Sequence, residues 1–297
     1  MVDSIFSIAF FVQSLRITVP YALPALGATF SERGGVVNIA LEGILLIAAF
    51  ATTVGTFYTN SPLIGILCGI VVGILTALLH SIISVTFKAD QIVSGIAINL
   101  FAVGITKFSC QLLFHSSSNS DRIVGIEQWN ISSTVPIFNY PFIIATIILL
   151  LIANFILFKT RFGLRLRAVG EHPKAAETLG INVHTMRHAG VLISGALTGL
   201  GGAWLALDQH SFTDGMSAGR GFIALAAMIV GKWKPFGAVG ACLVFGIAEN
   251  VANQLQGGLV PTQFIQMLPY VLTMIVLAGF IGRSIPPAAD GIPYEKE

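Results

Sequence analysis

Long apolar stretches follow one another along most of the chain, separated by short polar connections. A helix needs about 20 apolar residues to cross the ~30 Å hydrocarbon layer of a membrane. Two prolines interrupt the first stretch and the seventh is too short to span alone, so the pattern predicts eight to ten membrane-spanning helices in one domain. The nine stretches are 5–30, 36–57, 62–87, 91–114, 141–158, 187–207, 221–231, 235–255 and 263–282.

The composition supports this fold class. Of 297 residues, 55% are hydrophobic and 10% are charged, whereas soluble proteins carry roughly 25% charged residues. A transmembrane β-barrel would show short alternating segments instead. We therefore predict an all-α, multi-pass membrane protein in contact with lipid. The net charge of +2 gives no reason to expect nucleic acid as a partner, and the three cysteines lack the spacing of a metal site.

Basic residues concentrate in the connection 159–187, which holds six of the sixteen lysines and arginines and has a net charge of +4. Such a loop is expected in the cytoplasm. Alternation of the helices then places the N-terminus and the loops 115–140 and 208–220 outside. It places 32–35, 88–90, 232–234 and the C-terminal tail inside.

Two parts of the chain resemble each other. "GGVVNIALEG" is followed by a Pro-led helix rich in small residues, and "GRGFIALAAMIVG" is followed by another. The predicted orientation makes the first segment begin inside and the second outside. This opposite direction is typical of an inverted repeat, and transporters built this way place the substrate near the interface of the repeats.

A few polar side chains interrupt the apolar stretches. Asn38 and Glu42 lie four residues apart, as do Glu249 and Asn253, so each pair would share a helix face; Asn99 is a fifth candidate. An acid in the membrane interior costs about 2.5–3.5 kcal/mol or more, so it should face protein or water. These residues either line a translocation path or bind neighbouring helices as structural groups.

The segment "GEHPKAAETLGI" predicts a helix of about two turns between two long helices. Pro173 suits the first turn and Gly180 suits the end. So short a helix is marginal alone and needs something to pack against. It is either a docking element or a solvated connector.

No ATP-hydrolysis motif G-x-x-x-x-G-K-[ST] occurs in the sequence, and no nucleophile motif or dinucleotide fingerprint is present. The chain is therefore not expected to be an enzyme. If it transports actively, the energy comes from another subunit or from an ion gradient.

Three blocks carry a family resemblance: "SERGGVVNIALEGILLIAAF", "AVGEHPKAAETLGINV" followed by "ISGALTGLGGAWLAL", and "GRGFIALAAMIVGKWKPFGA". Together they resemble the permease subunits of ABC importers of the branched-chain amino acid/ribose/nucleoside group. The likeness is nearest to nucleoside-type (guanosine or purine nucleoside) permeases that work with basic-membrane-protein lipoproteins. The chain has "RGG" where Arg-Ser-Gly is expected, and Ala40 where Gly is common.

The resemblance implies a bacterial cytoplasmic membrane location and several partners. These are an ATP-binding subunit that holds ATP and Mg²⁺, a second and non-identical permease, and a substrate-binding lipoprotein outside; no cofactor is implied in this chain. It also implies that the short helix docks on the ATPase, with close packing at Ala175, Ala176 and Gly180. The implied coupling residues are Glu171, His172, Pro173, Ala175, Ala176 and Gly180.

The function expected from these observations is nucleoside import by ATP-driven alternating access. The acids and amides named above would line the path, and Phe101 and Phe222 would stack a base, although core packing is the alternative for both. A sugar, riboflavin or branched-chain amino acid permease is an alternative. A proton-coupled secondary transporter that uses Glu42 or Glu249 is an alternative of another class.

Overall fold

The computed structural model describes residues 7–126, 139–255, 267, 271 and 284–295. In this part of the chain all regular structure is helical, which confirms the predicted fold class. The helices are α2 (Ile8–Arg33), α3 (Leu41–Thr59), α4 (Pro62–Ser81) continued by the π-helix η1 (Ile82–Thr86), α5 (Gln91–Phe114), α6 (Pro141–Lys159), α7 (Arg161–Glu171), α8 (Pro173–Thr178), α9 (Val183–Gln209), α10 (Arg220–Val230) and α11 (Pro235–Leu255).

Seven helices within the described residues are long and apolar enough to cross a membrane: α2, α3, α4 with η1, α5, α6, α9 and α11. The predicted span 263–282 lies outside the described residues apart from Met267 and Val271, so the total of eight to ten stays a prediction. α10 is too short to span, as the sequence indicated. The connection 159–187 contains α7, a helix that the sequence analysis did not predict.

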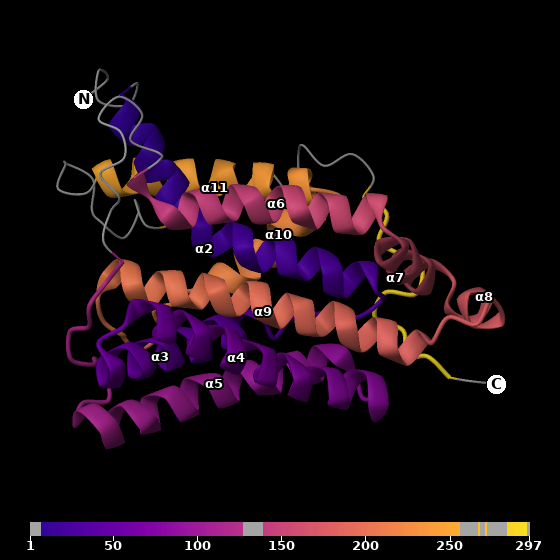
Figure 1. Cartoon of the computed structure of the whole chain (residues 1–297), viewed down its shortest axis with the longest axis horizontal. Helices are drawn as coiled ribbons and strands as arrows, with labels where there is room; N and C mark the ends of the chain where they lie inside the picture. The colour runs from indigo at the N-terminus through magenta and orange to yellow at the C-terminus, as the bar shows by residue number, and fades with distance from the viewer. Residues whose placement is uncertain (1–6, 127–138, 256–266, 268–270, 272–283, 296–297) are drawn as a thin grey trace.

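The long helices lie side by side along the longest axis of the molecule, with α9 in the middle (Figure 1). α9 packs against α2, α3 and α4, and it is the most buried of the seven long helices. α5 lies at one edge of the bundle, whereas α6 and α11 lie at the other (Figure 1). The large apolar side chains left exposed on α4, α5 and α6 are those expected of helices that face lipid or another subunit.

Glycines allow α4 and α9 to approach closely. A Cβ atom on Gly73 would lie 2.6 Å from the carbonyl oxygen of Gly195, and one on Gly199 would lie 2.7 Å from that of Gly69. Two helices in a membrane gain little from burying apolar side chains against each other, because lipid is as apolar as leucine. Close packing at small residues stabilises their association instead. A larger residue at any of these positions would push the two helices apart.

The connections between helices gather at two ends of the bundle. At one end, called here the α8 end, lie α7, α8 and residues 284–295, and there Arg33 donates a hydrogen bond to the carbonyl of Trp233. At the opposite end Arg16 pairs with Asp208 at 2.6 Å. The connections predicted to be cytoplasmic lie at the α8 end, which is the grouping that the charge pattern requires. Which end faces the cytoplasm stays a prediction.

Candidate functional site

Two non-helical segments bring two helix N-termini together inside the bundle. Residues 34–40 separate α2 from α3 and are mostly buried, so α3 begins later than the apolar pattern predicted. Residues 210–219 separate α9 from α10 in the same way. The N-termini of α3 and α10 then meet, because a Cβ atom on Gly221 would lie 2.4 Å from the backbone nitrogen of Glu42. Only glycine permits this approach.

The meeting point lies inside the bundle, away from both of its ends. α10 has 11 residues, so it rises about 16 Å from this point before it ends beside Trp233 at the α8 end. That distance is about half of a ~30 Å hydrocarbon layer. α3 runs the other way, to the opposite end, where the ring of Phe57 packs on Phe114. Oppositely directed helices that begin at mid-membrane are typical of transporter substrate sites.

Glu42 caps the N-terminus of α10. One oxygen, Oε1, accepts a hydrogen bond from the backbone N–H of Gly219 at 2.8 Å, and Oε2 accepts one from Gly221 at 2.7 Å. A helix N-terminus carries partial positive charge and unpaired N–H groups, so a carboxylate there is stabilised. Glu42 is only partly buried. It is therefore a carboxylate that is bound to a neighbouring helix and is not fully enclosed.

Glu249 forms the centre of a second group of contacts. Its Oε1 accepts a hydrogen bond from Nη2 of Arg220 at 2.8 Å, and its Oε2 accepts one from the hydroxyl of Tyr21 at 2.5 Å. The guanidinium of Arg220 also lies over the Tyr21 ring, 5.7 Å from its centre. The side chains of the ion pair are each 18% exposed. These contacts tie α11 and α2 to the first residue of α10.

The two asparagines stabilise the break before α3. Asn38 lies within the non-helical residues and is fully buried, and its Nδ2 donates to Oγ of Ser194 in α9 at 3.0 Å. The prediction that Asn38 and Glu42 share a helix face is therefore wrong, because the chain is not helical at Asn38. Asn99 accepts a hydrogen bond from Gly43 N–H at 2.7 Å and donates one to the carbonyl of Ile39 at 3.0 Å. It satisfies backbone groups that the missing helical turn leaves unpaired.

The other three residues predicted to line the path, Phe222, Asn253 and Phe101, lie at different places relative to the two N-termini. Phe222 is 48% exposed and follows Gly221, the residue that meets Glu42. Asn253 is exposed on α11, one turn beyond Glu249. Phe101 is 56% exposed but lies two residues from Asn99, about 200° around α5. Phe101 therefore points away from α3, and the structure does not bring it to the site.

Sequence analysis missed Arg220 and Tyr21. Arg220 stands between two glycines just before an apolar run, so it was taken as the last residue of an outside loop. Tyr21 stands between two prolines in an apolar stretch, with no polar neighbour to mark it. A lone arginine at the start of a short apolar helix is the one signal that could have pointed to a buried ion pair.

The predicted short helix is confirmed as α8, with Pro173 as its first residue and Gly180 in a left-handed conformation (φ +79°) after its end. His172, Ala175 and Gly180 are exposed, as is Glu171 at the end of α7. Ala176 is instead buried against this same chain, so it cannot be the close-packing position that the resemblance implied. Leu179, which the sequence analysis did not single out, is 81% exposed.

Residues 10–277 match the family described as branched-chain amino acid transport system / permease component. The chain belongs to this permease family. It is 44% identical to the nucleoside ABC transporter permease protein NupC of Lactococcus lactis, over 94% of each chain. It is 42% identical to the guanosine ABC transporter permease protein NupQ of Bacillus subtilis, over 96% of this chain and 98% of the relative. The predicted family is confirmed.

A solved structure shares the fold of this permease. It is described as an inward-facing conformation of a putative metal-chelate type ABC transporter, and it matches with a TM-score of 0.53 and 18% identity over 92% of this chain and 85% of the other. Permeases of this kind work with an ATP-binding subunit, which agrees with a transport subunit rather than an enzyme. The multi-pass membrane location follows from the same family and the seven apolar helices.

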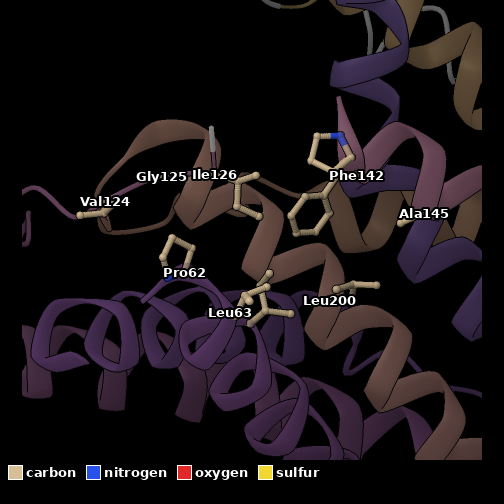
Figure 2. A pocket seen from close by; sticks show the side chains of 10 residues that line it. Pro62, Leu63, Val124, Gly125, Ile126, Phe142, Ala145 and Leu200 are labelled. Carbon is tan, nitrogen blue, oxygen red and sulfur yellow. The ribbon is translucent and has the colours of Figure 1, made fainter. Parts of the chain in front are cut away.

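The permease also has an apolar cavity of about 530 Å³, between the first turns of α4 and α6 and the middle of α9 (Figure 2). Among the residues that line it are Pro62, Leu63, Val124, Phe142 and Leu200. None of the described side chains that line it can form a hydrogen bond, so this part of the cavity does not suit a hydrophilic substrate. The two N-termini with Glu42 and Glu249 remain the candidate site.

Proposed function

We propose that this permease is a membrane-spanning subunit of an ATP-driven nucleoside importer in the bacterial cytoplasmic membrane. The observation that carries the proposal is the likeness to NupC and NupQ, which extends over nearly the whole length of each. The partners proposed with it are an ATPase that binds ATP and Mg²⁺, a second and non-identical permease, and a substrate-binding lipoprotein outside.

The candidate site suits a nucleoside. Nucleosides are neutral and present sugar hydroxyls and base edges, to which carboxylates and amides can hydrogen-bond. Glu42 and Glu249 supply such groups beside the two N-termini, and Asn253 supplies one a turn further along α11. Phe222 supplies a ring on which a base can stack. Glu42 is only partly buried and Phe222 is half-exposed, so the second permease would complete the path beside them.

The packing suggests how motion reaches this site. Ala176 of α8 packs on Val183, the first residue of α9. α9 in turn packs along α3, whose N-terminus carries Glu42. An ATPase that moves α8 would therefore move α9 and α3 together, and the junction with α10 would open or close. This is alternating access driven from outside the chain.

We expect Leu179→Glu to uncouple the permease from its ATPase. Leu179 is exposed at the end of the helix proposed to dock, and burying a charge there without a partner group is costly, so recovery of the co-expressed ATPase should fall by at least about tenfold. Guanosine uptake by cells should fall equally. Leu179→Met, which keeps the apolar contact, should retain both.

The same assay tests the substrate. Unlabelled inosine should compete with guanosine uptake, whereas ribose, leucine and riboflavin should not. Competition by ribose or leucine without competition by inosine would refute nucleoside import. Full ATPase recovery with Leu179→Glu would refute docking through this end of α8.

A further inference from the structure

Residues 284–295 cross the α8 end of the bundle as a non-helical segment, called here the strap (Figure 1). Its contacts run over five helices: α10, α7, α2, α9 and α8. Ser284 donates to the carbonyl of Ile229 in α10 at 3.1 Å, and the backbone N–H of Ala289 donates to the carbonyl of Gly170 in α7 at 2.9 Å. The strap then reaches α9 and finally α8. A segment without helix or strand is held here by side chains and backbone groups of the bundle.

Arg187 in α9 holds the middle of the strap. Its guanidinium is fully buried, and it donates to the carbonyl of Ile292 at 2.8 Å and to that of Ala289 at 3.4 Å. A buried arginine that binds two backbone carbonyls restrains the path of the chain, because breaking either bond would leave buried polar groups without a partner. The contact with α9 is therefore specific to this conformation of the strap.

Asp290 joins the strap to the end of α2 through the carboxyl of Glu32. Burial raises the pKa of Asp290 to about 7, although the hydrogen bond with Glu32 and the charge of Arg187 act to lower it. A proton shared by the two carboxyls lets them lie together away from water.

Tyr294 joins the strap to α8. Its side chain is 5% exposed and packs with Val169, Ala176 and Val183, which come from α7, α8 and α9. The hydroxyl donates a hydrogen bond to Glu177 of α8. A helix of six residues cannot hold its shape alone, so Tyr294 supplies a packing partner that the sequence analysis found to be necessary.

We propose that the strap is a positioning element that locks α8 to α9 and ties both to the C-terminal end of α10, with Tyr294 and Arg187 as its positioning residues. The proposal rests on the proposed function of α8 as the ATPase docking element. It adds a second mechanical link, through which the motion of α8 reaches the two N-termini from the α10 side as well as through α9.

The test compares Tyr294→Ala and Tyr294→Phe with the control Ile292→Ala in the full complex with its ATPase. The Ile292 side chain is 56% exposed and only its backbone carbonyl binds Arg187, so the control leaves the strap bound. The two readouts are hydrogen exchange of the α8 backbone amides and guanosine taken up per ATP hydrolysed.

Tyr294→Ala should speed exchange in α8 by at least about tenfold and lower uptake per ATP several-fold. Tyr294→Phe keeps the ring and loses only the hydroxyl bond, so its exchange should rise about threefold. If the alanine variant does not accumulate in membranes, the phenylalanine variant carries the test alone. Native exchange in α8 of the tyrosine variants would overturn the proposal. Failure of the ATPase to co-purify with the unaltered chain would refute the docking role of α8 instead. The hydrogen-exchange result would still test whether the strap positions α8.

Discussion

Replacing Glu42 by alanine should reduce guanosine uptake by at least about 100-fold. The carboxylate accepts two backbone hydrogen bonds at the N-terminus of α10, and hydrogen bonds to charged groups contribute about 1.5–3 kcal/mol each. Losing both costs at least about 3 kcal/mol at the junction of α3 and α10, in the part of the path where the substrate is proposed to pass. Uptake in cells, normalised to permease in the membrane, measures the effect.

Two variants serve as controls for Glu42→Ala. Glu42→Gln retains one acceptor oxygen, so it should keep one of the two bonds and about a tenth of the uptake. Asp121→Asn removes a carboxylate from an exposed loop and should have no effect. Asn38→Ala, by contrast, removes a buried contact with Ser194 and should lower stability before it affects the path. Native uptake by Glu42→Ala would show that the α10 cap is dispensable.

Replacing Glu249 by alanine should destabilise the permease and abolish uptake. The change leaves the guanidinium of Arg220 without its carboxylate in a largely buried position. Removing one partner of a buried ion pair costs about 3–5 kcal/mol, because the remaining charge stays away from water. We expect an apparent melting temperature in detergent at least about 5 °C below that of the native chain.

The double variant Arg220→Met with Glu249→Leu separates stability from transport. It replaces both charges with apolar side chains of similar size, which is often neutral for stability. The melting temperature should therefore recover, while uptake stays low because the polar group near the path is gone. A double variant that melts as low as Glu249→Ala would contradict this explanation, since no unpaired charge remains in it.

The sequence predicted the class of the protein and the position of most spans, because an apolar run of about 20 residues usually forms a membrane-spanning helix. It also predicted α8, since Pro173 and Gly180 mark its two ends. It failed at residues 34–40. Val36, Val37 and Ile39 are apolar whether the chain is helical or extended, so hydrophobicity cannot distinguish a buried non-helical segment from the first turns of a helix.

The candidate site was predicted only in part, for a related reason. Glu42 and Glu249 stood out because acids are rare in apolar stretches. Their partners did not, because Glu42 binds backbone groups of Gly219 and Gly221, and Glu249 binds Tyr21 from the far end of the chain. Contacts between residues so distant in the sequence follow from the packing of the bundle and not from any local pattern. They show that Glu42 holds α10, whereas its place in the lining of the path stays a prediction.

The most direct measurement is guanosine uptake by proteoliposomes that contain this permease, its proposed second permease, the ATPase and the binding lipoprotein. We predict uptake only when ATP is present on the side of the ATPase, with complete inhibition by vanadate. Uptake by the chain alone, insensitive to vanadate and driven by a proton gradient, would contradict the account and favour a secondary transporter.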